Sequence, residues 1–140
     1  MIEHIFLYGT LLPDHAPAEI ADVARQLHPV GQAFVWGRLY DLGDYPGAIL
    51  DSSSDTMIVG KVFELPEDKE MLAKLDRYEG FDPSDPDASL FVRMTSSVTL
   101  DEDGELQCWI YLYNREPGEA PIIANGKYAQ WREAESVNAP

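Results

Sequence analysis

The sequence predicts a single domain of the α+β class over residues 1–140. The chain has the size of one domain, and its hydrophobic content of 45% is enough for one core. Strand-like and helix-like patterns follow one another in the order strand, helix, strands, helix and hairpin. The hairpin has the strongest signal, because Asp101-Glu-Asp-Gly104 is a turn sequence between two β-rich segments.

A strand and a helix are predicted near the N-terminus. Residues Ile5–Tyr8 form a short apolar run that ends at Gly9, which is typical of a buried strand that enters a turn. Pro17 is a favoured first residue for the helix that follows. Apolar residues then recur at helical spacing, at Ile20, Val23, Ala24 and Leu27. We expect Pro29 to help to end this helix.

Two central strands are predicted over residues 33–42 and 57–65, which are rich in β-branched and aromatic residues. Residues 43–47 lie between them and have the composition of a turn-rich loop. Within that loop, Tyr45-Pro-Gly47 is expected to form a stiff turn that could wall a pocket or serve only as a turn.

The second predicted helix, over residues 66–80, places a carboxylate in its apolar stripe. Acids come early, bases follow and Gly80 ends the segment, as the helix dipole and capping favour. Glu79 departs from this order, because it falls on the same face as Leu72 and Leu75. Partial burial and the negative end of the dipole both raise the pKa of a carboxyl group. Glu79 is therefore a candidate general acid/base, although such a glutamate can instead reach water or pair with an arginine.

The hairpin strands are predicted over residues 90–100 and 106–114, after an acidic loop over residues 81–89. In the second strand, Tyr111 and Tyr113 share one face with Trp109, opposite Cys108. That face can either line a pocket or pack as a second core surface. Beyond the hairpin we expect a short helix near Tyr128 and Trp131, and a flexible tail over about residues 134–140.

The loop Tyr8-Gly-Thr-Leu11 is a second candidate site. A strand that ends at Gly9 leaves free backbone N–H groups at the end of a sheet, and glycine lets a ligand approach closely. Such a loop can hold an anion. An ordinary turn is the alternative.

Composition and motifs exclude several kinds of partner. The net charge is −15, and only ten Lys and Arg residues are present, which argues against nucleic acid or an anionic membrane. No stretch approaches the length of a membrane span, and the N-terminus lacks the basic flank of a signal peptide. The lone Cys108 cannot form an internal disulfide, the histidines lack ligand spacing, and no nucleotide-binding motif is present. We therefore expect a cytoplasmic protein without a metal or other cofactor.

Four motifs follow one another over about residues 5–114: Tyr8-Gly-Thr-Leu11, Tyr45-Pro-Gly47, Leu75-Asp-Arg-Tyr-Glu-Gly80 and Phe91-Val-Arg93. In this combination the chain resembles the gamma-glutamylcyclotransferase-like superfamily, and within it the gamma-glutamylamine cyclotransferase and AIG2-like branch. The resemblance implies a small, strongly curved, mainly antiparallel β-barrel flanked by helices. Phe91 stands where members often carry a tyrosine, so one hydroxyl contact of the family is absent.

The resemblance also implies a reaction. Members cleave a gamma-glutamyl amide by attack of the substrate's own α-amino group on its side-chain carbonyl, which releases 5-oxoproline and an amine without a cofactor. Glu79 would transfer the proton as the catalytic residue. The residues that would bind the small-molecule gamma-glutamyl substrate are Tyr8, Gly9, Thr10, Leu11, Tyr45 and Tyr113.

Two alternatives remain open. A non-catalytic binding or regulatory module could keep the same fold and pocket, because fold does not determine function. Within the enzyme class, the reaction could serve general turnover or remove a gamma-glutamyl protecting group in a biosynthetic pathway.

Overall fold

The computed structural model describes residues 2–9, 18–43, 45–101 and 104–128. Its elements in chain order are β1 (His4–Leu7), α1 (Ala18–Ala24), β2 (His28–Asp41), β3 (Pro46–Leu50), β4 (Met57–Glu64), α2 (Lys69–Glu79), the 3-10 helix η1 (Pro86–Ala88), β5 (Phe91–Leu100) and β6 (Glu105–Tyr113). The sequence-predicted tail over residues 134–140 and Trp131 lie outside the described residues.

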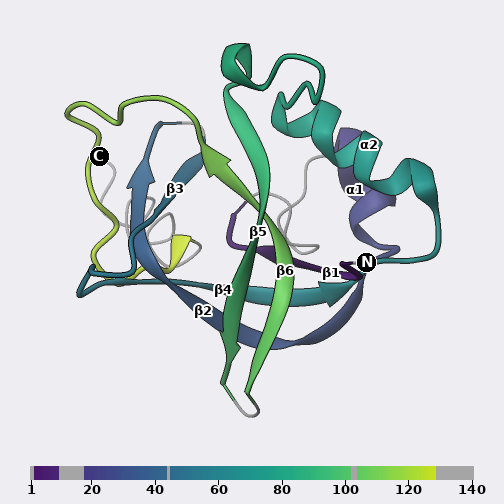
Figure 1. Ribbon diagram of the computed structural model, residues 1–140, viewed down its shortest axis with the longest axis horizontal. Coiled ribbons are helices and arrows are strands. Elements are labelled where there is room, and N and C mark those ends of the chain that lie inside the picture. Colours follow the sequence, from purple (N-terminus) through teal and green to yellow (C-terminus); the bar gives the residue numbers. More distant parts are fainter. Residues whose placement is uncertain (1, 10–17, 44, 102–103, 129–140) are drawn as a thin grey trace.

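Five of the strands close into a barrel (Figure 1). They are hydrogen-bonded in the order β2, β4, β1, β6 and β5, and β5 pairs back with β2 to complete the ring. Every pair is antiparallel except β1 with β6, which is parallel. The remaining strand, β3, extends the sheet beyond β2. The predicted α+β class and the curved, mainly antiparallel barrel are confirmed.

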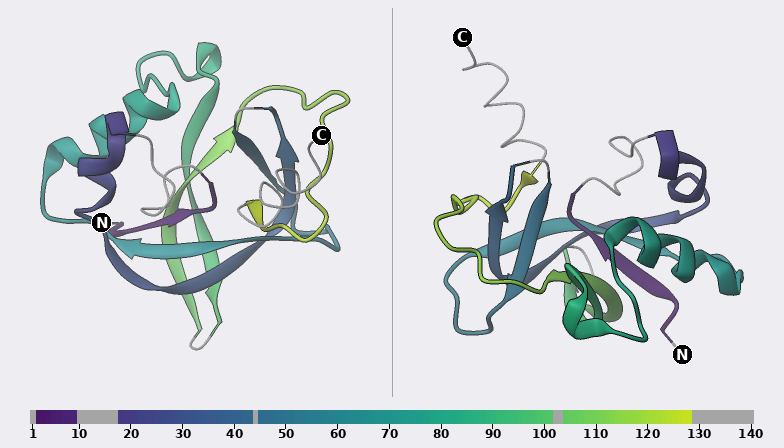
Figure 2. Two further views of the ribbon diagram at one scale, coloured as in Figure 1. Left: turned by 180° about the vertical axis from the view of Figure 1, so that it is seen from behind. Right: turned by 90° about the horizontal axis from the view of Figure 1, so that it is seen from above.

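The two α-helices contact each other on one side of the barrel (Figures 1 and 2). They cover a cluster of apolar residues that includes Ile5 and Leu7 of β1, Leu75 of α2, and Tyr111 of β6. The alternate residues of the same strands point into the barrel and form its core, with Phe6, Cys108 and Ile110 among them. Strands β1 and β6 are thus buried on both faces, as their period of two requires when both sides are covered. Among the described residues, no helix is long and apolar enough to cross a membrane.

Helix α2 has clear signals at both ends. The carboxylate of Asp68 accepts a hydrogen bond of 2.9 Å from the backbone N–H of Glu70, which caps the N-terminus. Gly80 ends the helix with a φ of 74°, a left-handed conformation that glycine adopts without steric cost. The helix therefore begins at Lys69 and not at residue 66, because the capping residue comes later than the sequence pattern indicated.

Two predictions about proline were wrong. Pro29 does not end a helix, because α1 ends at Ala24 and Pro29 lies in β2 opposite Phe63, beside a shift of register that accommodates it. Pro46 and Gly47 do not form a turn but begin β3, where Pro46 lies opposite Asp41. Because β3 is the last strand of the sheet order, a proline without an N–H is tolerated there.

Strand β4 passes so close to β1 that Gly60 has no room for a side chain. A Cβ atom at Gly60 would lie 2.3 Å from the carbonyl oxygen of Leu7. We expect Gly60→Ala to lower the free energy of unfolding by about 1–3 kcal/mol, since the two backbones must separate. Urea denaturation measures this change. The matched control is Gly31→Ala, because nothing lies within 4 Å of a Cβ built there. Equal stability of the two variants would contradict the crowding of β4 against β1.

Candidate active site

A pocket opens at the end of the barrel where β1 leaves the sheet. It has about 350 Å³ of empty space, part of which is open to solvent. Its walls come from segments far apart in the sequence, since β1, α2, β5, β6 and the start of β3 all contribute. The lining residues are Phe6, Leu7, Tyr8, Gly9, Tyr45, Pro46, Glu79, Phe91 and Tyr111. All four of the sequence motifs thus contribute residues to one place.

Glu79 is the acidic group of this pocket. It occupies the last turn of α2, directly before Gly80, and is half-buried as a residue. Burial of its carboxyl raises the pKa from an ordinary value of 4.5 to about 7. A carboxyl with this pKa is present in both protonation states at neutral pH, so it can both accept and donate a proton.

Tyr8 lies beside Glu79, but its hydroxyl is already engaged. The hydroxyl donates a hydrogen bond of 2.5 Å to the backbone carbonyl oxygen of Tyr111. Burial, and then the negative charge of Glu79, raise the pKa of Tyr8 well above its ordinary value. A backbone hydrogen bond from Ala48 lowers this pKa, but by less. Tyr8 therefore stays protonated and forms a pocket wall.

Gly9 follows Tyr8 at the point where β1 leaves the barrel. Its φ is not positive, so glycine is not needed there for a left-handed conformation. It is needed for space, because a Cβ atom at this position would lie 2.6 Å from Cγ of Pro46. Thr10 and Leu11, the other two residues of the predicted loop, lie outside the described residues.

The other two predicted binding residues have different positions. Tyr45 lines the pocket, and its ring packs edge-on against Phe91, with 5.7 Å between ring centroids. Tyr113 lies behind Phe91, with 5.6 Å between their ring centroids, and is not one of the lining residues. Tyr111 both lines the pocket and packs in the cluster beneath the helices, whereas Trp109 and Tyr113 pack against that cluster and are not among the lining residues.

Sequence reasoning missed a buried ion pair next to the pocket. Nε and Nη2 of Arg93 donate to the two carboxylate oxygens of Asp76 over 2.8 and 3.1 Å. The hydroxyl of Tyr111 donates to the same carboxylate over 2.7 Å. The guanidinium also stacks on Trp109, with its carbon 4.3 Å from the ring centroid. The available signal was an acid, Asp76, next to Leu75 in the apolar stripe of the predicted helix.

Comparison with solved structures confirms the class of fold. The YkqA protein of Bacillus subtilis superposes with a TM-score of 0.73 at 23% identity, over 100% of this chain and 44% of YkqA. The chain therefore spans less than half the length of that protein. An AIG2-like protein of Mus musculus superposes with a TM-score of 0.71 at 21% identity, over 91% of this chain and 88% of the mouse protein.

Sequence comparison then shows the family. The family described as gamma-glutamyl cyclotransferase, AIG2-like matches residues 5–132, and the chain belongs to this family. A protein of Halalkalibacterium halodurans that is named provisionally as a gamma-glutamylcyclotransferase is 31% identical over 104 residues, or 73% of this chain and 86% of that protein. The family that the four motifs predicted is confirmed.

The raised pKa of Glu79 predicts a specific dependence of stability on pH. The folded-state pKa of about 7 lies above the ordinary value of 4.5, so the folded state binds this proton more tightly than the unfolded state. The stabilising contribution is fully present below the lower value and is lost as the pH rises through the upper one. Relative to the wild type, Glu79→Gln should therefore gain up to about 3 kcal/mol in free energy of unfolding between about pH 4.5 and pH 8.

Urea denaturation at several pH values across this range measures the gain. Glu70→Gln is the matched control, because Glu70 is an exposed glutamate in the first turn of the same helix. A difference between Glu79→Gln and the wild type that does not change with pH would show that the carboxyl is not buried as described.

Proposed function

We propose that the protein is a gamma-glutamyl cyclotransferase that acts on a gamma-glutamyl amine or amino acid and releases 5-oxoproline and the free amine. The observation that carries the proposal is the half-buried Glu79 carboxyl, with a pKa of about 7, in the wall of the pocket. Membership of the gamma-glutamyl cyclotransferase, AIG2-like family supports the same reaction class.

The reaction needs one group that takes up a proton and returns it. The Glu79 carboxylate removes a proton from the α-ammonium of the substrate, which becomes a neutral amine. That amine attacks the γ-carbonyl carbon, a carbon–nitrogen bond forms and a five-membered ring closes. The γ-amide bond then breaks as the leaving amine receives the proton from Glu79. The second proton of the attacking nitrogen passes to the released amine, so the reaction is neutral in protons overall. A carboxyl with a pKa near 7 is suited to both transfers.

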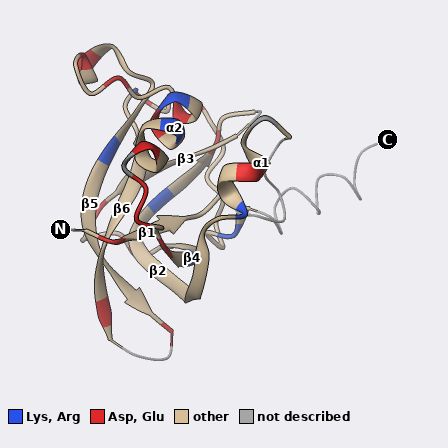
Figure 3. Cartoon of the chain, turned by 90° about the vertical axis from the view of Figure 1, so that its right-hand side faces the viewer, with Lys and Arg blue, Asp and Glu red and all other residues tan. Residues whose placement is uncertain are grey.

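The pocket contributes mainly by orientation. Holding the α-amine against the carbonyl can lower the activation free energy by about 7–11 kcal/mol. Acid/base catalysis can lower it by about a further 3–5 kcal/mol. Of the described residues that line the pocket, none is basic. Figure 3 shows Lys and Arg residues on α2 and β5 among other elements. The substrate carboxylate would therefore be received by neutral donors, for which we propose the backbone N–H groups of residues 9–11.

Glu79→Gln should abolish most of the activity. The amide is nearly isosteric but cannot accept and return a proton, so the rate of 5-oxoproline formation should fall by about 10²–10⁴-fold. Mass spectrometry of 5-oxoproline across a panel of gamma-glutamyl compounds measures the rate. The exposed Glu70→Gln variant should retain wild-type activity. A Glu79→Gln variant that turns over near the wild-type rate would assign Glu79 a structural role.

The nucleophile can be tested on the substrate itself. If the α-amine attacks, N-acetylation of that amine should stop the reaction, while the unmodified gamma-glutamyl amide is converted to 5-oxoproline. A simple amidase would release glutamate from the unmodified compound and N-acetylglutamate from the acetylated one, and a binding module would release nothing. The Cys108→Ser variant should remain active, because Cys108 is buried in the barrel core and burial raises its pKa to about 11. Glutamate as the main product, or cleavage of the acetylated compound, would rule out a cyclotransferase.

A further inference from the structure

Asp76, which forms the buried ion pair with Arg93, lies one helical turn before Glu79 in α2. Residues three apart in a helix are neighbours on its surface. Asp76 is only 4% exposed, and both of its carboxylate oxygens bind the guanidinium of Arg93 on β5. The third partner is the hydroxyl of Tyr111, whose ring lines the same pocket as Glu79.

Arg93 is close enough to the site to matter electrostatically. The pKa of Tyr111 is raised by burial first, then by Asp76 and Glu79, and it is lowered by Arg93, so both Arg93 and Glu79 act on the same hydroxyl. A guanidinium released from Asp76 and able to reach the Glu79 carboxylate would attract it and lower its pKa. In the structure the guanidinium is instead engaged by the two carboxylate oxygens of Asp76 and by the ring of Trp109.

Stability alone is a weak explanation for this pair. Replacing a buried ion pair with apolar residues of similar volume is often neutral or stabilising, because the desolvation of the two charges offsets their attraction. The side chains of Arg93 and Asp76 are 15% and 6% exposed, so the pair bears that desolvation cost. Its position between α2, β5 and the pocket wall indicates a role in the site.

We propose that Asp76 is a positioning residue that binds Arg93 and thereby keeps the guanidinium from pairing with the Glu79 carboxylate, with Tyr111 fixing the Asp76 carboxylate in place. Sequestering the arginine leaves Glu79 without a cationic partner among the described residues, which is the condition under which a buried carboxyl can serve as a general acid/base. The proposal deepens the proposed function and rests on it for its catalytic meaning. The binding of Arg93 by Asp76, and its effect on Glu79, can be tested without an activity assay.

The test follows the Glu79 carboxyl directly by carbon-13 NMR titration, with Glu79→Gln used to assign its signal. Among the described residues, the titratable groups that line the pocket with Glu79 are Tyr8 of β1, Tyr45 before β3 and Tyr111 of β6, and the Tyr111 hydroxyl links them to the charged pair Asp76 and Arg93. In Asp76→Asn the released guanidinium should lower the titration midpoint of Glu79 by about 1–3 pH units. In Asp76→Asn/Arg93→Met the midpoint should return towards the wild-type value, because the cation has been removed.

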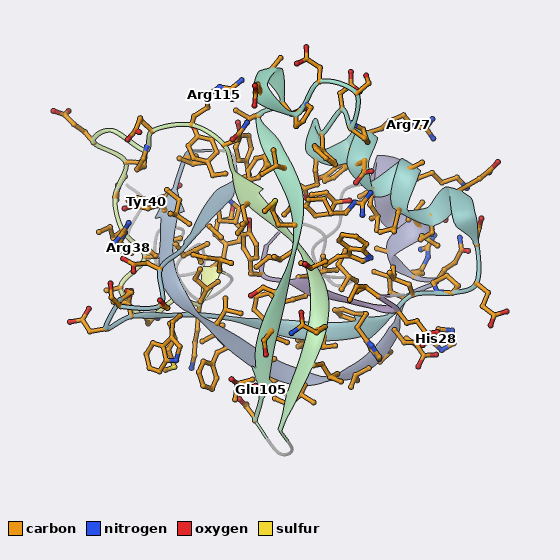
Figure 4. The ribbon with its side chains drawn as sticks, in the orientation of Figure 1. His28, Arg38, Tyr40, Arg77, Glu105 and Arg115 are labelled. Atoms are coloured by element: carbon orange, nitrogen blue, oxygen red, sulfur yellow. The ribbon has the colours of Figure 1, made fainter. Side chains whose placement is uncertain are left out.

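The matched control is Asp51→Asn, which also releases an arginine from an ion pair. Arg38 and Asp51 are paired over 2.9 Å, and Arg38 lies across the barrel from α2 (Figure 4). The Glu79 midpoint should not move in this variant. In the activity assay, the acidic limb of the pH–rate profile should move with the NMR midpoint in Asp76→Asn and return in the double variant.

Two results would overturn the proposal: an unchanged midpoint in folded Asp76→Asn, or a lowered midpoint that persists in the double variant. If Asp76→Asn does not fold, Tyr111→Phe takes its place, because it loosens Asp76 without leaving a charge unpaired. In Tyr111→Phe the titration midpoint of Glu79 should fall by a smaller amount. An unchanged midpoint in that variant would count against the proposal. If the wild type makes no 5-oxoproline but the midpoints move as described, the proposed function fails while the sequestering contact stands.

Discussion

The parallel pairing of β1 with β6 is the constraint on which the rest of the structure depends. It aligns Ile5 with Trp109 and closes a ring in which all other neighbours are antiparallel. The closure leaves β1 buried on both faces, with Phe6 in the barrel core and Leu7 beneath the helices. It also brings the hydroxyl of Tyr8 to the backbone carbonyl of Tyr111. Without that pairing β1 would be held by β4 alone, and Tyr8 would not be fixed against Tyr111 in the pocket wall.

The chemistry of the pocket follows from where charges are buried. The chain has a net charge of −15, and most of its carboxylates can remain in water. Glu79 is different, because its carboxyl is partly desolvated. The described lining around it is aromatic and apolar apart from the hydroxyls of Tyr8, Tyr45 and Tyr111, of which those of Tyr8 and Tyr111 bind the Tyr111 carbonyl and the Asp76 carboxylate. Desolvation rather than a charged neighbour therefore tunes this carboxyl. The nearby arginine is bound by a second acid of the same helix, and this leaves desolvation as the cause of the shift.

Much of the fold could be predicted where the signal is local. The strands that flank Asp101 to Gly104 begin or end within one residue of their predicted limits, because the turn sequence and the alternation of apolar residues lie in the same short segment. The position of Glu79 in line with Leu75 also follows from the helical repeat alone, and the structure has Leu75 buried and Glu79 in the pocket. Family membership could be predicted because several weak motifs occur in one order.

Other features could not be predicted from local patterns. Strand β3 begins with Pro46 and Gly47, which are turn formers in isolation, and becomes a strand because β2 offers it a partner. The position of Asp76 in the apolar stripe indicates burial, but the sequence does not pair it with Arg93; only the tertiary structure buries the two side chains together. From the sequence alone, Gly9 is interpreted as a residue that lets a ligand approach closely, whereas in the structure its missing Cβ makes room for Pro46.

The sequence by itself determined the class of fold, the two helices, most strand limits and the carboxylate at the end of the second helix. These depend on side-chain period and capping, which act over a few residues. The tertiary structure alone decided how the strands close, which residues surround Glu79, and which acid binds Arg93. A period of two specifies which face of a strand is buried, but not which strand lies beside it or which charge lies opposite.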